Sequence, residues 1–511
     1  MTRFFYCCLW CLSVQAQTTL PLFNRTFCSD TVSTITPAVQ VLSDGYLLFG
    51  NYTDDYANEH IYMRKLDLNG YPQWLRVIDD EWDENQNIDA ELGIIAYGRQ
   101  VITTTDNHIV LAYSKDTLSL TGTTRNVYLT KLDMNGERIW QHNYGISNRD
   151  EICRHVIQTL DGGFMLVGTQ GALNNEPGAS FYVIKTDASG IMEWDTTYVG
   201  NWGQALTVQQ TPWDNGYIIG GFALTDTTNY DMWVIKIGAA GELEWQRNFD
   251  GYQWADCGAR ISILTTLEEY QNSLPIRYLL FGCKNASFAE DSDAYIAVLD
   301  ELGYVIWSRE DYDTLLQGFL SFEVSPIIKQ DKSFVAIVAT SSPRPDNRLV
   351  HFSAIGDILS TQLITIDTLP TAPHYDLYLK DIKPTPDGGY VFAGYQFAPS
   401  PVKSWIVKTD SLGNTVPVED CESVDTAIDT VLPNAPLPAF VVHPNPATVD
   451  FRVEWRIADI PESALLYVYD LNGKIVAQSH HSATVSVRHL RHGIYYIRID
   501  GFNQVQKLAI F

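Results

Sequence analysis

Basic residues are scarce in this sequence, which has 34 Lys and Arg against 61 Asp and Glu. The formal net charge of -27 repels the phosphate backbone of nucleic acids and the head groups of anionic lipids. We therefore expect no nucleic-acid partner. The simplest interpretation of the charge is solubility in a crowded exterior.

Motifs that carry familiar chemistry are also missing. The sequence has no His-Glu-x-x-His, no Gly-x-Ser-x-Gly, no Gly-rich phosphate loop and no Cys or His cluster at metal-ligand spacing. We therefore predict no catalytic residue, no metal ligand and no cofactor. The one dense group of carboxylates lies between Asp79 and Glu84. Two of these could serve as acid and base, but a solvated loop is the simpler interpretation.

Long apolar runs are absent beyond the N-terminus, so no later segment is predicted to cross a membrane. Residues 1–16 have the pattern of a cleavable secretory signal peptide. Arg3 comes first, an apolar run extends from Phe4 to Val14, and Ala16 precedes a predicted cut at Gln17. The structural alternative for this segment is a buried first strand. A signal peptide predicts an exported protein.

Export would leave an odd number of cysteines in a compartment where disulfides persist. The five are Cys28, Cys153, Cys257, Cys283 and Cys421. At least one thiol then stays free. Cys257 and Cys283 flank a predicted hairpin and are the favoured pair.

Aromatic residues are abundant, with 13 Trp, 28 Tyr and 21 Phe among 511 residues. Such residues are typical of strands, and a chain of this length exceeds the size at which a single hydrophobic core keeps growing. We therefore expect an all-β protein with at least two folding units or a repeat array.

A turn motif recurs seven times along the chain. Its full form, Lys-x-Asp-x-x-Gly-x-x-x-Trp, is seen three times, from Lys65 to Trp74, from Lys131 to Trp140 and from Lys185 to Trp194. The four later copies lack one or more of the motif residues. The motif glycines, 51 to 66 residues apart, are Gly70, Gly136, Gly190, Gly241, Gly303, Gly356 and Gly413. This period suits one four-stranded blade of a β-propeller.

A second motif, Asp-Gly-Gly-aromatic, precedes the first in most repeats. It is clearest from Asp161 to Phe164 and from Asp387 to Tyr390. Variant or degenerate copies begin at Asp44, Asp106, Asp214 and Asp331. Asp and Gly permit the positive φ angles of tight hairpin turns. Each repeat therefore predicts two hairpins, or four strands, and seven repeats predict a seven-bladed propeller.

The ends of the repeat array indicate how the ring closes. In the seventh repeat Pro417 stands where the Trp of the turn motif is expected, and proline does not serve the interior of a sheet. That repeat therefore lacks a fourth strand. The segment from Leu20 to Phe27 resembles the fourth strands of other repeats and precedes the first. We predict that it completes the last blade and covers an edge that would otherwise invite aggregation.

The turn motif allows two ligand-based interpretations, which its residues do not favour. Asp67, Asn69 and Gly70 could suggest a calcium loop, but an isolated four-residue turn offers too few oxygen ligands. The Asp-x-x-Gly-x-x-x-Trp portion resembles the docking motif of pyrroloquinoline quinone propellers, which are usually eight-bladed, whereas the count here is seven. The repeated Trp is predicted to pack between adjacent blades.

Two resemblances place the chain among cargo proteins of the type IX secretion system. Residues 20–418 resemble the seven-bladed propellers of many such cargoes. Residues 440–511 resemble the type A sorting domain, and the matching residues include Pro444, Asn445, Pro446, Gly473, Gly493, Tyr495 and Lys507. The resemblance implies a small Ig-like β-sandwich that is read by the outer-membrane translocon and commonly cleaved, and a cargo that is secreted or held at the cell surface. His443 replaces the Tyr usual before the first Pro.

The expected organisation has four parts: a signal peptide at 1–16, a propeller at 17–420, a Pro-rich linker at 421–439 and the sorting domain at 440–511. Because tight turns gather at one end of each blade, longer loops gather at the other, where binding tends to reside. The loop candidates are Trp82, Asp83, Glu84, Trp202 and Trp254. Exposed Trp and carboxylates can bind a glycan or peptide, although a packing role is the alternative for each Trp.

Two classes of function stay open from the sequence. We favour a non-catalytic binding or adhesion propeller, which we expect to be a monomer. The alternative is a secreted hydrolase or lyase that acts on a polysaccharide or another polymer, since a fold alone does not decide activity.

Overall fold

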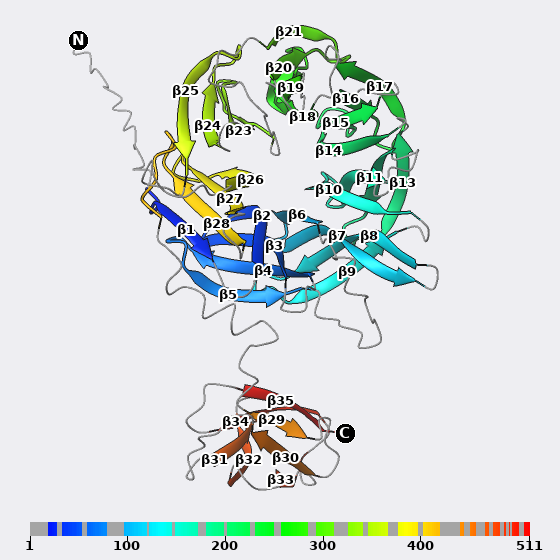
Figure 1. The fold of residues 1–511 in the computed structure, drawn as a ribbon. Coiled ribbons are helices and arrows are strands. Elements are labelled where there is room, and N and C mark those ends of the chain that lie inside the picture. Colours follow the sequence, from blue (N-terminus) through cyan, green and yellow to red (C-terminus); the bar gives the residue numbers. More distant parts are fainter. Residues whose placement is uncertain are drawn as a thin grey trace, which may run out of the picture. The chain divides into compact units, whose positions relative to one another are not determined.

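The computed structural model describes residues 19–27, 33–53, 59–78, 97–119, 122–145, 149–171, 180–198, 202–224, 230–249, 257–284, 293–310, 325–340, 346–365, 377–396, 402–418, 440–443, 450–455, 465–469, 474–480, 485–486, 490, 493–499 and 505–510. The described residues fall into two compact units, one within residues 1–425 and one within 426–511. The first unit is a ring of seven four-stranded antiparallel sheets, which confirms the predicted seven-bladed propeller (Figure 1).

Six blades are each built from four consecutive strands. Blade 1 contains β2 (Ser33–Leu42), β3 (Gly45–Thr53), β4 (Glu59–Asp67) and β5 (Pro72–Val77). Blade 2 contains β6 (Tyr97–Thr103), β7 (Ile109–Ser119), β8 (Gly122–Leu132) and β9 (Arg138–Tyr144). Blade 3 contains β10 (Glu151–Gln158), β11 (Phe164–Gln170), β12 (Ser180–Thr186) and β13 (Met192–Tyr198).

The next three blades follow the same order. Blade 4 contains β14 (Gly203–Gln210), β15 (Tyr217–Leu224), β16 (Tyr230–Ile237) and β17 (Leu243–Phe249). Blade 5 contains β18 (Cys257–Ile263), β19 (Tyr278–Lys284), β20 (Asp293–Leu299) and β21 (Val305–Arg309). Blade 6 contains β22 (Ile327–Ile328), β23 (Phe334–Thr340), β24 (Asp346–Phe352) and β25 (Ile358–Ile364). In each blade the first strand is innermost and the fourth lies on the outer rim (Figure 1).

Blade 7 combines two distant segments of the chain. It contains β26 (Leu377–Pro384), β27 (Tyr390–Gln396), β28 (Lys403–Thr409) and, as its outer strand, β1 (Phe23–Phe27). Strand β1 pairs antiparallel to β28, with Phe23 opposite Lys408. The N-terminal ribbon thus occupies the place that the sequence left vacant in the seventh repeat.

The turn motif forms the connection between the third and fourth strands of a blade. In blade 3, Oδ1 of Asp187 accepts hydrogen bonds from the backbone N–H groups of Ser189, at 2.8 Å, and Ile191, at 2.9 Å. Gly190 has a φ of 78°, a left-handed conformation in which a side chain is strained. The Asp and Gly of the motif are therefore explained by the geometry of the turn.

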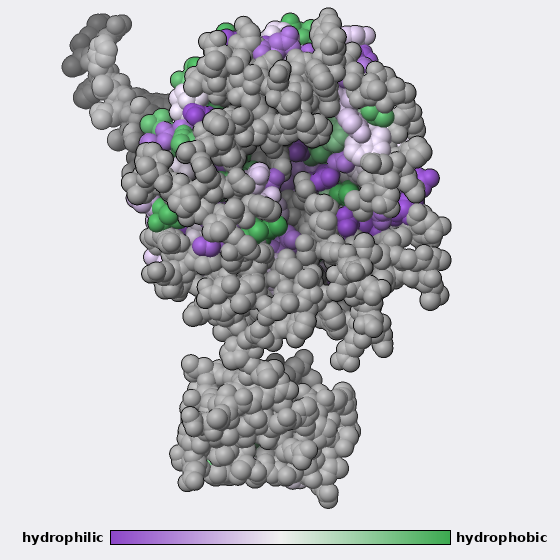
Figure 2. All heavy atoms as spheres, in the orientation of Figure 1, coloured by the Kyte–Doolittle hydropathy of each residue, from purple (hydrophilic) through white to green (hydrophobic). Residues whose placement is uncertain are grey.

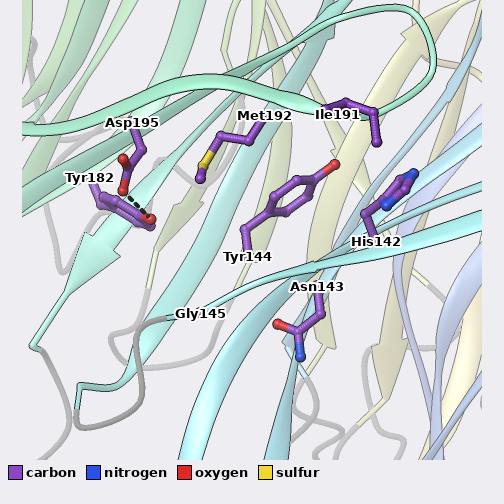
Figure 3. A pocket seen from close by; sticks show the side chains of 8 residues that line it. All are labelled: His142, Asn143, Tyr144, Gly145, Tyr182, Ile191, Met192 and Asp195. Carbon is purple, nitrogen blue, oxygen red and sulfur yellow. Dashed lines mark hydrogen bonds between the residues drawn. The ribbon is translucent and has the colours of Figure 1, made fainter.

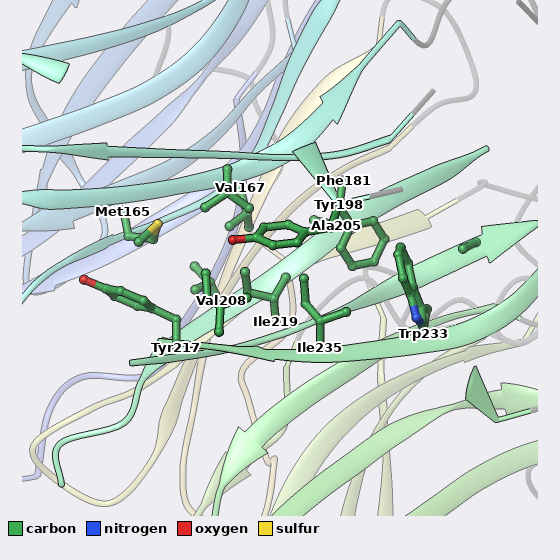
Figure 4. Packing of buried hydrophobic residues seen from close by; sticks show 13 residues of the cluster. Met165, Val167, Phe181, Tyr198, Ala205, Val208, Tyr217, Ile219, Trp233 and Ile235 are labelled. Carbon is green, nitrogen blue, oxygen red and sulfur yellow. The ribbon is translucent and has the colours of Figure 1, made fainter. Parts of the chain in front are cut away.

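Hydrophobic clusters fill the junctions between neighbouring blades. Between blades 3 and 4, for example, Met165, Val167 and Phe181 pack against Ile219 and Trp233 (Figure 4). Equivalent clusters join each of the other neighbouring pairs, including blades 7 and 1. Because each strand contributes alternate residues to two junctions, both faces of a blade are apolar.

The repeated Trp belongs to these junctions, as predicted. Trp140, on the outer strand of blade 2, packs against the cluster shared with blade 3. It also covers the turn glycine of blade 3, since a Cβ on Gly190 would lie 2.8 Å from atoms of the Trp140 ring. The same contact joins Trp194 to Gly241 and Trp245 to Gly303. The motif glycine thus meets two needs, a positive φ and room for an indole ring.

Strand β1 reproduces this outer-strand pattern in blade 7. Phe23 takes the place of the Trp, and a Cβ on Gly70 of blade 1 would lie 2.8 Å from its ring. Two residues later, Arg25 donates from Nε to the carbonyl of Asn69 at 3.1 Å, and its guanidinium carbon lies 3.7 Å from the centre of the Tyr71 ring. The ring of blades is closed by the same contacts that join its other members.

Blade 5 departs from the expectation that tight turns gather at one end of every blade. Its first two strands are joined by a longer segment that contains helix α1 (Leu267–Gln271). The helix begins with a capping box, in which Thr266 and Glu269 bond each other's backbone N–H groups. No Asp-Gly turn stands in this segment of the sequence, so the hairpin is opened by a helical insertion.

We predicted one disulfide and at least one free thiol among the cysteines, and the structure bears on both. Cys283 is disulfide-bonded, and Cys153 is a free, buried thiol. The backbone of Cys257 lies opposite Cys283 in the pairing of β18 with β19. The Cys257–Cys283 disulfide stays a prediction that this register supports.

The second unit contains two small sheets. One is formed by β29 (Phe440–His443), β30 (Asp450–Trp455) and β33 (Val485–Ser486), and the other by β31 (Leu465–Tyr469), β32 (Ile475–His480), β34 (Gly493–Ile499) and β35 (Val505–Ile510). Leu466, Val468, Tyr495 and Ile497 are buried. Among the described residues of the whole chain, no helix has the length and apolarity needed to cross a membrane.

Candidate functional site

The loop candidates predicted from the sequence fall mostly outside the described residues. This holds for Trp82, Asp83, Glu84 and Trp254. Trp202 is described, and its ring packs against Phe222, with centroids 5.8 Å apart, and Tyr230, at 5.1 Å. Trp202 therefore has a packing role within blade 4.

An open pocket of about 230 Å³ lies on the outer rim between blades 2 and 3 (Figure 3). We call it the rim pocket, and its lining residues are His142, Asn143, Tyr144, Gly145, Tyr182, Ile191, Met192 and Asp195. The first three end strand β9, Gly145 follows it, and Tyr182 belongs to β12, whereas the others follow the turn of blade 3. Sequence reasoning missed this pocket, because its residues are brought together only by the contact between two repeats.

The rim pocket has an apolar middle and polar ends. Figure 3 shows Met192 and Tyr144 between the Tyr182–Asp195 pair and His142. Met192 is 46% exposed, so part of this apolar surface is open to a ligand. The pocket could accept a flat or apolar group in its middle and hydrogen bonds at its ends.

Hydrogen bonds fix the polar side chains of the rim pocket. Tyr182 donates to Oδ2 of Asp195 at 2.8 Å, and Tyr144 donates to the carbonyl of Gly190 at 2.6 Å. Burial, followed by the hydrogen bond to Asp195, raises the pKa of Tyr182, and burial also raises the pKa of Tyr144. Both hydroxyls are therefore protonated donors at neutral pH. No bond from a described residue to Oδ1 of Asp195 is present, so this oxygen is an acceptor for a ligand.

A second group of charged residues lies at the tight-turn end of the propeller. In five blades the motif lysine pairs with the aspartate of the Asp-Gly turn. The pairs are Lys65–Asp44 at 2.6 Å, Lys131–Asp106 at 2.7 Å, and Lys185–Asp161, Lys236–Asp214 and Lys408–Asp387 at 2.9 Å. We call these the hairpin ion pairs. These ion pairs could have been predicted from the sequence, because the Lys of the turn motif and the Asp of the second motif recur in the same repeats.

The hairpin ion pairs are structural rather than catalytic. The Lys185 side chain is 3% exposed, and its Nζ also contacts the carbonyl of Thr186 and the carboxylate of Glu193. Such a lysine is fully engaged in tying two hairpins together. Within the described ranges, no three His, Cys, Asp or Glu side chains are grouped so as to hold a metal ion.

Comparison with known proteins identifies the C-terminal region. Residues 441–510 match the secretion system C-terminal sorting domain. The match confirms the predicted sorting domain of the type IX system and implies a secreted or cell-surface cargo protein. Of its predicted motif residues, Gly493 lies at the start of β34, Tyr495 is buried and Lys507 belongs to β35. Pro444, Asn445, Pro446 and Gly473 lie outside the described residues.

Solved structures similar to this chain include a glycosidase and the β-propeller domain of a protease. The α-L-arabinofuranosidase Arb93A from Fusarium graminearum is 9% identical, with 62% of this chain and 92% of that chain covered and a TM-score of 0.40. The β-propeller domain of the Trilobed protease from Pyrococcus furiosus is 9% identical, with coverages of 75% and 97% and a TM-score of 0.35. No curated protein matches. Similarity at this level carries no inference about activity.

Proposed function

We propose that this protein is a non-catalytic binding propeller of the cell exterior, which holds a sugar or a short peptide in the rim pocket. The observation that supports this function is the arrangement of Tyr144, Met192 and Asp195 around one open hollow (Figure 3). An aromatic edge and a thioether offer apolar contact, and a carboxylate oxygen accepts from a hydroxyl or amide. Sugars and peptides carry both kinds of group.

The sorting domain explains how such a module reaches its ligand. In the proposed route, residues 1–16 direct the chain across the inner membrane, and the C-terminal domain, an Ig-like sandwich, is read by the outer-membrane translocon. Truncation after Pro438 is then expected to trap the protein in the periplasm. Normal surface display or secretion of the truncated protein would refute this route.

Glycan and peptide arrays, run beside a polysaccharide turnover assay, test the binding function. The sharpest variant is Met192→Glu, because it puts a charge into the apolar middle of the pocket at a residue that is already 46% exposed. Loss of a buried apolar contact together with desolvation of a charge is expected to weaken binding by at least about tenfold. Asp195→Asn should have a smaller effect.

Ile306→Glu is the matched control, since Ile306 is also 46% exposed and lies on the outer strand of blade 5. Equal loss of binding in both variants would place the ligand elsewhere. Trp82, Asp83, Glu84 and Trp254 lie outside the described residues and remain the ligand residues proposed from the sequence. Polymer turnover that is abolished by changing Asp83 or Glu84 would favour the hydrolase or lyase alternative over simple binding.

A further inference from the structure

The two tyrosines of the rim pocket already use their hydroxyl protons in bonds to the protein. The Tyr182 hydroxyl donates to Oδ2 of Asp195, 2.8 Å away. The Tyr144 hydroxyl donates to the carbonyl of Gly190, 2.6 Å away. Each hydroxyl therefore offers a ligand only the lone pairs of its oxygen.

The other polar side chains that face the rim pocket are acceptors as well. Nε2 of His142 lies 3.0 Å from the carbonyl of Ser189, and because a carbonyl only accepts, this nitrogen carries the ring proton. In the neutral ring Nδ1 is then an acceptor, as is Oδ1 of Asp195. Asn143 points to the other side of strand β9 (Figure 3), and its amide donates to the Tyr128 hydroxyl at 3.1 Å. The described side chains that face the pocket thus present acceptors and no unused donor.

The charge around the rim pocket is negative. Of the described residues that line it, Asp195 is acidic and none is a lysine or an arginine. Figure 2 shows hydrophilic residues at the right-hand rim of the propeller, the side on which strand β13 lies. The chain as a whole has a net charge of -27, which raises the local concentration of cations. A positively charged ligand is favoured on both scales.

The size and the apolar middle of the rim pocket suit a single long side chain. Its volume of about 230 Å³ is below the roughly 300 to 1,000 Å³ of sites that enclose a drug-sized ligand. Ile191 and Met192, which are 55% and 46% exposed, line it beside the ring of Tyr144. A lysine side chain has an apolar stem of methylene groups and a charged end. An amino sugar carries hydroxyl groups around its ring and has no such stem.

We propose that the rim pocket binds the side chain of a lysine in a peptide, with its ammonium at Oδ1 of Asp195 and its stem against Met192. The inference rests on the proposed function and names the ligand of the same pocket. An ammonium has three donors and no acceptor, so it complements a pocket of acceptors. A guanidinium prefers both oxygens of a carboxylate, and Oδ2 of Asp195 already accepts from Tyr182. Lysine is therefore preferred to arginine, and the tyrosine rings add a cation–π attraction.

Binding of small probes to the full chain, measured by NMR titration, tests the ligand class without any variant. The probes are the Nα-acetyl amides of lysine, arginine and norleucine, and norleucine keeps the stem but lacks the ammonium. The lysine probe should bind at least about threefold more tightly than the norleucine probe. Equal binding of these two probes, or tighter binding of the arginine probe, would overturn the inference.

Two substitutions at one position test whether the ligand is charged. Met192→Lys and Met192→Glu remove the same apolar surface and differ in the sign of the added charge. The lysine probe should bind at least about fivefold more weakly to the first than to the second. The norleucine probe should not distinguish them. The matched controls Ile306→Lys and Ile306→Glu, at a residue that is also 46% exposed, should bind both probes as the unchanged protein does.

This inference and the proposed function can fail separately. A neutral sugar or peptide whose binding is weakened by Met192→Glu, with no preference for the lysine probe, would keep the binding function of the pocket and overturn the choice of lysine. If neither the arrays nor the probes show binding that depends on Met192, both proposals fail. Asp195→Asn should weaken the lysine probe by about two- to fivefold, because Asp195 is exposed and solvent screens its charge. It should leave the norleucine probe unchanged.

Discussion

Blades 7 and 5 join their two hairpins differently. In blade 7, Nζ of Lys408 lies 2.9 Å from the carboxylate of Asp387, and the two side chains are 0% and 6% exposed. In blade 5, Val298 occupies the position of the lysine, and helix α1 replaces the Asp-Gly turn. Val298 packs in the apolar cluster between blades 5 and 6. Blade 5 thus lacks both the lysine and the aspartate of the pair.

Blade 6 is intermediate between these two. His351 stands at the lysine position, and its Nδ1 lies 3.4 Å from Nζ of Lys329, on the neighbouring turn. Burial, followed by the charge of Lys329, lowers the pKa of His351. The positive charge has therefore moved from one hairpin to the other. A propeller blade tolerates an ion pair, a relocated charge or an apolar contact at this point, provided that no charge is buried alone.

Blade 7 differs in a further respect, because its ion pair also contacts the start of the chain. The backbone N–H of Leu20 donates to Oδ2 of Asp387 at 3.1 Å. Removal of residues 17–28 would delete this contact and strand β1, and would leave the edge of β28 and the cluster around Phe23 and Phe27 open. We expect loss of cooperative unfolding, measured by calorimetry, which is the largest effect predicted here.

The matched control for this deletion lies in blade 5. Replacement of residues 265–276, which contain α1, by a short Asp-Gly turn should leave a single cooperative transition with a modestly lower melting temperature, because the helix has no buried residue. If the protein without residues 17–28 melted as the unchanged chain does, closure by the N-terminal strand would not be needed for the fold.

The hairpin ion pair of blade 7 provides the second test. Asp387→Ala leaves the buried ammonium of Lys408 without its carboxylate and should lower the free energy of unfolding by about 3 to 5 kcal/mol. Lys408→Val combined with Asp387→Ala, which copies the residue of blade 5, should recover part of that loss. Denaturant unfolding of the two single variants and the double variant gives the coupling energy. Simple additivity would show that the two side chains do not act as a unit.

The repeat array was predictable because each of its sequence motifs lies within a single strand or a single turn. Seven turn glycines gave the number of blades, and the Trp of the motif indicated the junctions. Closure could be predicted because Pro417 stands where the last Trp is expected and because residues 20–27 resemble the fourth strands of other repeats. Helix α1 was not predicted, since a five-residue helix with a local cap leaves a weak periodic signal.

Two glycines of blade 3 allow the two roles of a turn glycine, a positive φ and room for a neighbouring ring, to be tested separately. Gly190 and Gly162 both have a positive φ, of 78° and 87°. A Cβ on Gly190 would lie 2.6 Å from Cδ2 of His142 and 2.8 Å from the Trp140 ring, whereas the nearest atom to a Cβ on Gly162 is 3.8 Å away. Gly162→Ala should therefore cost about 1 to 2 kcal/mol for backbone strain alone. Gly190→Ala adds a steric clash and should cost about 3 kcal/mol.

Denaturant unfolding at neutral pH measures both changes. Equal effects would show that the rings of Trp140 and His142 move aside without loss of stability, and that the contact between blades 2 and 3 is not tightly packed. Trp140→Leu together with Gly190→Ala should recover only part of the extra cost, because the His142 ring still lies against the added methyl group.

The candidate sites were harder to predict than the fold. The residues of the rim pocket come from two repeats, so no local motif joins them. The loop residues proposed from the sequence were chosen because variable loops often carry function. That rule indicates which part of the fold binds a ligand, but not which side chains come together there.

The smallest expected effect is a pH dependence of the free energy of unfolding. Blade 3, which has a hairpin ion pair, should contribute to it, and blade 5, which has none, should not. Burial raises the pKa of Asp161, but hydrogen bonds from Thr159, Lys185 and the backbone of Gly163 outweigh it and lower the pKa to about 2. Because the folded pKa is below the unfolded value of about 3.9, this group stabilises the fold above pH 4 and loses that effect as pH falls toward 2. The side chain is 57% exposed, so solvent limits the gain to about 1 kcal/mol.

Asp161→Asn should therefore lower the unfolding free energy by about 1 kcal/mol or less at pH 6 and have no effect near pH 2. A change of Val298 to Ala in blade 5 should cost the same at both pH values, because it alters only apolar packing. Urea unfolding of the two variants at pH 2, 4 and 6 measures the difference. An Asn variant whose deficit persisted undiminished at pH 2 would mean that Asp161 acts through its turn hydrogen bonds and not through its charge on Lys185.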